Sequence, residues 1–251
     1  MNMFRNTAAI ILAGGKGSRM NSELPKVLHK VGGKQLILRN IEKLKSVGLQ
    51  DFYIVVGYKA QEVEEVVSSE HEVVFATQEE PLGTNHALET ALDLINPCWF
   101  ENIFVINGDD AALYKDETLK EYIQSHIDSK AVISIMTLEL EGEHELGKIV
   151  RDEKGNFENT LEKFEYKDID LDSNEINCGV YIYNTKWVCE NVKKVKQNGK
   201  REYPITDLMK LAKEQGKAVH LYKLADRNEW AGVNTPEELE AVNKLVQDLN
   251  H

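Results

Sequence analysis

Short apolar runs rich in β-branched residues alternate with segments of helical periodicity through the first half of the chain. The runs that predict strands are Ala8–Leu12, Phe52–Val56, Glu72–Ala76 and Asn102–Ile106. Amphipathic segments between these runs predict helices at Leu36–Val47, which Gly48 follows, and at Thr84–Ile95. Such alternation is typical of parallel strands joined by crossover helices. The pattern therefore predicts an α/β fold with a mostly parallel sheet flanked by helices.

Beyond Asn107 the alternation weakens. Further strands are predicted at Val132–Leu138 and Ile176–Tyr183, and the polar, acidic stretch Glu139–Glu175 between them predicts an inserted lid or hairpin with Glu139–Glu145 as a solvated edge. The last segment has the clearest helix signals: Thr235 as N-cap, Pro236 at the first helical position and Glu238 two positions later. The apolar stripe of this helix, residues 235–250, consists of Leu239, Val242, Leu245, Val246 and Leu249.

Composition narrows the possible partners. The chain carries 30 Lys and Arg residues against 42 Asp and Glu residues, a net charge of −12, which argues against nucleic acid or a membrane as a partner. The three cysteines are widely spaced and form no CxxC pair, which favours a reducing compartment over a disulfide framework or a zinc site. The apolar run Thr7–Leu12 is too short for a signal peptide or a membrane span. We therefore expect a cytoplasmic protein. We also expect Cys98, Trp99, Trp187 and Trp230 to be packing residues of the core.

A glycine-rich loop, LAGGKGSRM from Leu12 to Met20, follows the first predicted strand. Its glycines let the backbone approach a ligand and present N–H groups to an anion, although a plain strand-to-helix turn would use the same residues. A P-loop is excluded because Gly17 follows Lys16, and a dinucleotide fingerprint because Arg19 or Met20 stands where the third glycine belongs. Lys26, Lys30 and Lys34 extend the basic character of this part of an acidic chain. Charge is thus concentrated where phosphates would bind.

The longer stretch LAGGKGSRMNSELPKVLHKVGGK resembles the signature of the sugar-1-phosphate nucleotidyltransferases, and most of all the uridyltransferase domain of the bacterial N-acetylglucosamine-1-phosphate uridyltransferases (UDP-N-acetylglucosamine pyrophosphorylases). Further stretches match this family in the same order, namely QEEPLGTNHAL, INGDDAAL, ELGKIVRD, EINCGVY, EYPITDL and WAGVNTPEEL. The resemblance implies the Rossmann-like nucleotide-diphospho-sugar transferase fold in one domain, with a nucleotide-binding part at about 1–110 and a sugar-binding part at about 111–234. The chain shows no hexapeptide repeat, so we expect no left-handed β-helix acetyltransferase domain in it.

The resemblance also implies roles for individual residues. It assigns nucleotide binding to Leu12, Ala13, Gly14, Gly15, Gln78, Gly83 and Thr84. It assigns contacts with the reacting phosphates to Lys16, Arg19 and Lys26, with Lys26 at the α-phosphate. It assigns the Mg²⁺ ion to Asp109 and Asn234, and the sugar to Gly147, Glu162 and Asn177.

The chemistry of the expected reaction fits these residue types. A sugar phosphate has a second pKa of about 6, so it is a strong anionic nucleophile at neutral pH and needs no general base. Catalysis then depends on positioning and on positive charge around two anions. Asp109 follows a predicted strand at the carboxyl end of the sheet, where ligands collect, and Asp110 is its neighbouring competitor for the metal. Without the resemblance, Asp109 would be interpreted as an acidic residue in a solvated turn or at a helix N-cap. Glu162 and Asn177 would be interpreted as solvated polar residues. His86 is interpreted as structural.

The identity of the acceptor is left open by departures from the family pattern. Cys178 stands where threonine is usual, and Asn85 replaces a small residue. Gly15 departs from the more common family pattern of alanine followed by glycine. Lys163 after Glu162 resembles the Glu-Lys pair of the glucose-1-phosphate branch. The leading interpretation is transfer of UMP from UTP to N-acetylglucosamine-1-phosphate. The alternatives are glucose-1-phosphate with dTTP or UTP, cytidylyl transfer to an alcohol phosphate, and a catalytically silent regulatory homologue that binds nucleotide sugars.

Overall fold

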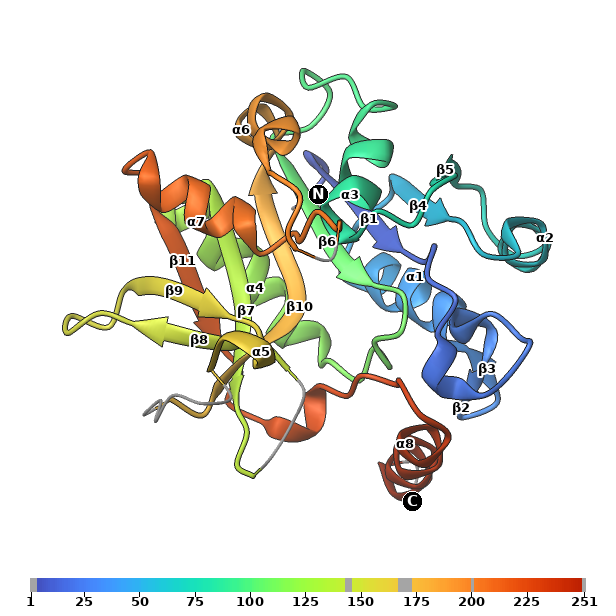
Figure 1. The fold of residues 1–251 in the computed structure, drawn as a ribbon. Helices are drawn as coiled ribbons and strands as arrows, with labels where there is room; N and C mark the ends of the chain where they lie inside the picture. The colour runs from blue at the N-terminus through green and yellow to red at the C-terminus, as the bar shows by residue number, and fades with distance from the viewer. Residues whose placement is uncertain (1–3, 143–145, 167–172, 200, 250–251) are drawn as a thin grey trace.

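The computed structural model describes residues 4–142, 146–166, 173–199 and 201–249. A nine-stranded sheet has the main order β11-β7-β10-β6-β1-β4-β5 (Figure 1). These strands are β1 (Thr7–Leu12), β4 (Phe52–Val56), β5 (Val74–Thr77), β6 (Asn102–Asn107), β7 (Ile133–Glu139), β10 (Glu175–Asn184) and β11 (Val219–Lys223). Along this path only β10 runs antiparallel to its neighbours. The predicted α/β fold with a mostly parallel sheet is confirmed.

Helices cover both faces of the sheet. One face carries α1 (Leu36–Ser46), α2 (Ala60–Ser68) and α4 (Asp116–Ser129), and the other carries α3 (Thr84–Leu92), α6 (Thr185–Asn191) and α7 (Asp207–Glu214). Successive residues of β1 point to opposite faces, so that Ala9 and Ile11 join the first core while Ala8 and Ile10 join the second. All four are fully buried, because a central strand of such a sheet has helices on both sides.

The acidic stretch after β7 forms the predicted hairpin. Strands β8 (Lys148–Arg151) and β9 (Phe157–Leu161) pair antiparallel, and Lys148 of β8 is in register with Ile176 of β10. The short helix α5 (Lys163–Tyr166) follows. Glu139 is exposed, as expected for a solvated edge, whereas residues 143–145 lie outside the described residues. The hairpin extends the sheet beside β10 (Figure 1).

The C-terminal helix α8 (Pro236–Leu249) begins with the predicted capping box. The Glu238 N–H donates to Thr235 Oγ1 at 3.2 Å, and the Thr235 N–H donates to Glu238 Oε2 at 3.2 Å. Val242 and Val246 pack with residues near the glycine-rich loop, and α8 contacts β2 (Lys30–Val31), which pairs with β3 (Lys34–Gln35). The chain's last helix is thereby held against its first loops. Single-turn helices lie at Ser18–Met20, Lys26–Leu28, Val192–Lys194 and Arg227–Glu229.

Some expectations are corrected. Strand β5 begins at Val74 instead of the predicted Glu72, because its pairing with β4 starts there. Helix α3 ends at Leu92, three residues before the predicted end at Ile95. Trp99 is 61% exposed and Cys98 is exposed, so neither packs in the core; both lie in the connection between α3 and β6. Trp187 is buried and Trp230 is partly buried, as expected. Within the described part of the chain, no helix has the length and apolar character that crossing a membrane would require.

Buried His126 of α4 predicts a pH dependence of stability. Its Nδ1 lies 2.7 Å from Ser134 Oγ and its Nε2 lies 3.1 Å from Asn102 Oδ1, and the residue is 2% exposed. Burial lowers the pKa of His126 to about 4. The imidazole therefore takes up a proton near pH 6.5 in the unfolded chain, but only near pH 4 in the folded chain. The free energy of unfolding should fall by roughly 3 kcal/mol as the pH falls from about 6.5 to about 4.

Urea unfolding measured at pH 7.5 and at pH 4.5 tests this prediction with the variant His126→Gln. The variant removes the titrating ring, so its free energy of unfolding should change less between the two pH values than that of the wild type. The same pH dependence in both proteins would show that His126 contributes nothing to it.

Candidate active site

The carboxyl ends of β1 and β6 bring the glycine-rich loop and Asp109 together. Leu12, the last residue of β1, is in register with Asn107, the last residue of β6. The Gly108 N–H donates to the carbonyl of Leu12 at 2.9 Å. A Cβ atom on Gly108 would lie 2.9 Å from Val27 Cγ1, so the turn that presents Asp109 requires glycine. Two segments that are about 90 residues apart in sequence therefore leave the sheet side by side.

The glycine-rich loop packs closely against its surroundings. A Cβ atom on Gly14 would lie 3.1 Å from Gln78 Oε1, and one on Gly17 would lie 2.7 Å from Lys26 Cβ. Gly17 also has a φ of 64°, which favours glycine. Of the other predicted nucleotide-binding residues in this loop, Ala13 is buried and Gly15 is exposed. The loop thus rests on Gln78 at one end and on the stem of Lys26 at the other.

Lys26, Asp109, Asn234 and Arg19 form one polar cluster. Lys26 Nζ forms an ion pair with Asp109 and donates to Asn234 Oδ1 at 3.1 Å. Arg19 Nη2 donates to the same Asn234 oxygen at 3.0 Å. The Lys26 and Asp109 side chains are only 16% and 18% exposed, so water screens this pair less than an ordinary surface pair. The structure thus brings together two of the three predicted cations and both predicted metal ligands.

Lys16, the third predicted cation, lies apart from this cluster. Its ammonium is 5.4 Å from the centroid of the Tyr58 ring, and the residue is exposed. Tyr58 follows β4, on the opposite side of β1 from β6. Any contact between Lys16 and a triphosphate would therefore be made from the Tyr58 side of the loop.

Backbone hydrogen bonds join the segments that carry Asp109 and Asn234. The Val233 N–H donates to the Asp109 carbonyl at 3.0 Å, and the Ala111 N–H donates to the Ala231 carbonyl at 2.9 Å. The Asn234 N–H donates to Glu238 Oε2 at 2.6 Å. The acid of the α8 capping box therefore also positions the residue predicted to bind the metal.

Asp110 is buried beside this cluster and serves a different purpose. Its carboxylate accepts hydrogen bonds from the Tyr114 hydroxyl at 2.6 Å and from the Ala112 N–H at 2.7 Å. Burial raises the pKa of Asp110 to about 7, against the opposing effect of these two hydrogen bonds. Both carboxylate oxygens are thus used inside the turn that follows Asp109.

Three of the predicted nucleotide-binding residues, Gln78, Gly83 and Thr84, form a second group beyond the glycine-rich loop. Gln78 Nε2 donates to the Gly83 carbonyl at 3.1 Å and lies 3.0 Å from His86 Nδ1. Gly83 has a φ of 102°, and a Cβ atom there would lie 2.7 Å from the Tyr203 carbonyl oxygen. Thr84 Oγ1 accepts a hydrogen bond from the Ile205 N–H at 3.0 Å. His86 thus helps to hold Gln78, which is consistent with a structural role.

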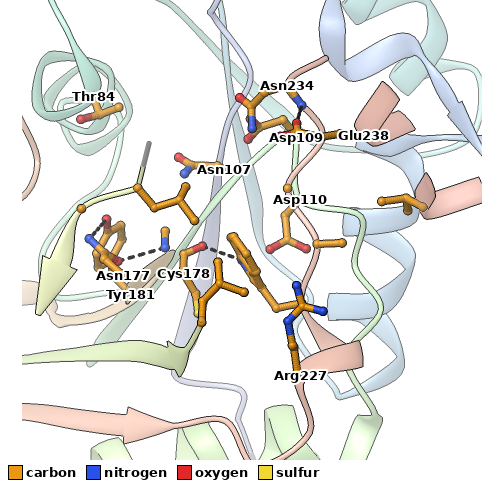
Figure 2. A pocket seen from close by; sticks show the side chains of 18 of the residues that line it. Thr84, Asn107, Asp109, Asp110, Asn177, Cys178, Tyr181, Arg227, Asn234 and Glu238 are labelled. Atoms are coloured by element: carbon orange, nitrogen blue, oxygen red, sulfur yellow. Dashed lines mark hydrogen bonds between the residues drawn. The ribbon is translucent and has the colours of Figure 1, made fainter. Parts of the chain in front are cut away.

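A cavity of about 730 Å³ joins Thr84, Asp109 and Asn234 to the three predicted sugar-binding residues. Figure 2 shows Thr84, Asp109, Asn177 and Asn234 around it. The Asn177 N–H donates to the Gly147 carbonyl at 3.0 Å. Glu162 Oε1 lies 3.4 Å from Thr206 Oγ1 and 3.6 Å from where a Cβ atom on Gly147 would be. The three residues therefore line one wall together, although they come from three segments: Gly147 directly before β8, Glu162 between β9 and α5, and Asn177 in β10.

A bulge in β10 shapes this wall. The register of β10 against β7 shifts between Asn177 and Tyr181, and Gly179 has a φ of 75°. Asn177 Nδ2 donates to the Tyr181 hydroxyl at 2.9 Å, and its Oδ1 accepts from the Gly179 N–H at 3.0 Å. Asn107 lies so close to Gly179 that a side chain at 179 would clash with it. A glycine directly inside an apolar strand was the one local signal of the bulge.

Trp230 closes the adjacent side of the cavity. Its indole N–H donates to the carbonyl of Cys178 at 2.9 Å (Figure 2, dashed line from Cys178). The Cys178 side chain is buried in the core, so the cysteine that replaces the usual threonine contributes its backbone carbonyl to this contact. Among the residues of the cavity that the sequence analysis did not assign to the site are Asn107, Gly179, Tyr181, Thr206, Arg227 and Trp230.

Comparison with known proteins decides the family. The family model described as nucleotidyl transferase matches residues 8–248. The chain belongs to the nucleotidyl transferase family. It is 37% identical over 241 residues to the bifunctional protein GlmU of Carboxydothermus hydrogenoformans, covering 94% of this chain and 52% of that protein. It is also 37% identical over 240 residues to GlmU of Streptococcus gordonii, covering 95% and 51%. The chain thus spans about half the length of the curated relatives it matches.

Solved structures share the fold of this nucleotidyltransferase. The crystal structure named "Putative Glucose-1-Phosphate Thymidylyltransferase from Bacillus anthracis", in complex with sucrose, superimposes with a TM-score of 0.82 at 22% identity, over 98% of this chain and 97% of that chain. HddC from Yersinia pseudotuberculosis has a TM-score of 0.72 at 21% identity, over 96% and 99%. At this level of identity the structural match establishes the fold, and the sequence match establishes the family.

Proposed function

We propose that this nucleotidyltransferase transfers UMP from UTP to N-acetylglucosamine-1-phosphate, or a close hexose-1-phosphate, and releases pyrophosphate. The observation that carries the proposal is one cavity that runs along all three sets of predicted residues. It connects Thr84, a predicted nucleotide-binding residue, to the predicted metal ligands Asp109 and Asn234. It continues to the predicted sugar-binding residues Gly147, Glu162 and Asn177. A nucleotide donor and a polar, hydroxyl-rich acceptor could lie end to end in it. The similarity to GlmU proteins over the whole matched region supports the same choice.

Asp109 and Asn234, which line the cavity, fit a magnesium ion. Lys26 Nζ contacts an Asp109 oxygen and the Asn234 amide oxygen at the same time, so the ammonium stands in for a cation held by both. A carboxylate and an amide oxygen, completed by phosphate oxygens and waters, make a normal magnesium shell. A bound Mg²⁺ would neutralise charge on the reacting phosphates.

The side chains of this enzyme supply the rest of the reaction by charge and position. The acceptor phosphate is already ionised at neutral pH and attacks the α-phosphorus in line with the departing pyrophosphate. Lys26 stabilises the charge that develops around the α-phosphate, while Arg19 holds the outer phosphates. Glu162 and Asn177 orient the sugar so that its phosphate points to Asp109 and Asn234.

The release of pyrophosphate, measured with Mg²⁺ across a grid of nucleoside triphosphates and sugar phosphates, tests this proposal. The highest kcat/KM should occur with UTP and N-acetylglucosamine-1-phosphate. A maximum with dTTP and glucose-1-phosphate would favour the activity named for the B. anthracis structure, and a maximum with CTP and an alcohol phosphate would favour cytidylyl transfer. Nucleotide binding without release in any combination would indicate a regulatory homologue.

Asn177→Ala should raise the KM for the sugar phosphate by about 5- to 150-fold, since it removes about 1–3 kcal/mol of hydrogen bonding to the sugar. The KM for the nucleotide should stay within about twofold, because Asn177 lies at the acceptor end of the cavity. Steady-state kinetics with each substrate varied in turn measures both values. Asn174→Ala is the matched control, since Asn174 is exposed three residues away. Equal KM values for the sugar phosphate in the two variants would remove Asn177 from the acceptor site.

A further inference from the structure

The two oxygens that fit a metal ion are occupied by the enzyme's own cations. Asp109 Oδ2 is paired with the Lys26 ammonium, and Asn234 Oδ1 accepts from both Lys26 and Arg19. Lys26 and Arg19 are also the side chains proposed to hold the triphosphate. The same two cations are therefore needed in two places, at the metal ligands and at the phosphates.

We propose that Lys26 and Arg19 couple nucleotide binding to metal binding by exchanging partners. Without substrate, Lys26 neutralises Asp109, both cations bind Asn234, and together they hold the metal position closed. When a triphosphate arrives, its anionic oxygens take the two cations and leave both oxygens free for the divalent cation. The inference rests on the proposed function, because it requires a triphosphate at the glycine-rich loop and a cation at Asp109 and Asn234.

The charges of the site oppose the binding of either ligand alone. A divalent cation that enters the substrate-free site must displace or approach the ammonium of Lys26, whose side chain is 16% exposed, so the repulsion is poorly screened. A triphosphate without metal must compete with Asp109 for Lys26 and is repelled by the carboxylate it leaves uncovered. Each ligand removes the obstacle to the other. Thermodynamic linkage requires the effect to be reciprocal, and couplings of this kind amount to about 5- to 150-fold in affinity.

The local structure keeps Lys26 within reach of both partners. Its Cβ, Cγ and Cδ atoms would all lie within 3.3 Å of a Cβ atom on Gly17, so the stem packs against the glycine-rich loop itself. The ammonium at its end reaches Asp109 on the neighbouring loop. Lys16 has the same charge in the same loop, but its ammonium lies over Tyr58. Lys16 therefore provides a matched control for the loss of one positive charge.

Binding of Mn²⁺ to the full chain without nucleotide, measured by electron paramagnetic resonance, tests the metal half of the exchange. Lys26→Met removes the ammonium and keeps most of the stem, and it should bind Mn²⁺ at least about 5-fold more tightly than the wild type. Lys16→Met should match the wild type. Equal or weaker binding by Lys26→Met would overturn the proposal, as would an equal gain in both variants, which would show a general effect of charge.

Binding of UTP in the presence of EDTA, measured by calorimetry, tests the nucleotide half. Asp109→Asn cannot hold Lys26 as an ion pair, so it should bind metal-free UTP at least about 5-fold more tightly than the wild type. Asp93→Asn is the matched control, because Asp93 is an exposed acid paired with Lys193. Weaker or unchanged binding by Asp109→Asn would contradict the exchange. The Mn²⁺ experiment uses no substrate and measures no turnover, so its outcome is separate from the test of the proposed reaction.

Discussion

Replacing Asp109 with alanine is expected to lower kcat/KM by at least about 10³-fold, which corresponds to roughly 4 kcal/mol of lost transition-state stabilisation. The expectation follows from the position of the carboxylate, which is next to Lys26 and Asn234, lines the cavity and is presented by a turn that only glycine can form. It is the one formal negative charge in this cluster. Loss of the carboxylate would remove the charged ligand for the metal and leave an amide to hold it alone. Pyrophosphate release with saturating Mg²⁺ measures the effect.

The fold should survive this substitution, because the backbone hydrogen bonds that hold the turn remain. The Val233 N–H still donates to the carbonyl of residue 109, and Asp110 still accepts from Tyr114. The melting temperature of Asp109→Ala should therefore stay within a few degrees of the wild-type value. Asp93→Ala, which removes an exposed acid far from the cavity, should keep full activity. Turnover of Asp109→Ala within tenfold of the wild type would remove Asp109 from the metal site.

The sequence predicted the central strands well because their signal is strong at every position. Five of the six residues of β1 and all five residues of β4 are buried, so a run of apolar residues marks each strand without reference to its neighbours. The capping box of α8 was predictable for a similar reason, since Thr235 and Glu238 bond to each other within one turn. Local interactions leave a local pattern.

Some strands and helices that are only partly buried were not predicted from the sequence, because their apolar pattern is weaker. No residue of β11 is fully buried, and His220 and Lys223 interrupt its apolar pattern. The buried face of α4 includes Tyr122 and His126, which read as weakly apolar in a sequence although both are buried and hydrogen-bonded. The antiparallel direction of β10 also has no local signature, because the burial pattern of a central strand is the same in either direction.

The candidate site also combines residues that a local sequence pattern marks with contacts that form only in the fold. The glycine-rich loop and the residues matched to family motifs could be named. Arg19, Thr84, Asp109, Gly147, Glu162, Asn177 and Asn234 line one cavity, and Lys26 reaches it through Asp109 and Asn234. The contact between Trp230 and Cys178 joins residues 52 positions apart, and nothing at either position indicates the other. Nor does the sequence show that Lys26 is paired with Asp109, 83 residues away. Motifs identify which residues carry chemistry, whereas their pairing follows from the fold.

That pairing makes Lys26 the most informative cation to remove. Lys26→Met is expected to lower kcat by about 10²- to 10³-fold, or roughly 3–4 kcal/mol, since the ammonium that contacts the bound triphosphate would bind the α-phosphate more strongly as charge develops there in the transition state. The KM for the nucleotide should change much less. Methionine keeps the packing of the stem against Gly17, so the loop should hold its shape. Single-turnover measurements at saturating nucleotide report the chemical step directly.

Lys16→Met distinguishes a catalytic charge from a binding charge in the same loop. Lys16 lies over Tyr58 and away from Asp109, so its removal should raise the KM for the nucleotide and leave kcat within about tenfold of the wild type. A loss of kcat in Lys16→Met as large as that in Lys26→Met would show that the loop acts through its total charge. An unchanged kcat in Lys26→Met would assign Lys26 to packing and to neutralising Asp109. A selective loss of kcat in Lys26→Met would place the chemical step where the cations of the loop meet Asp109 and Asn234.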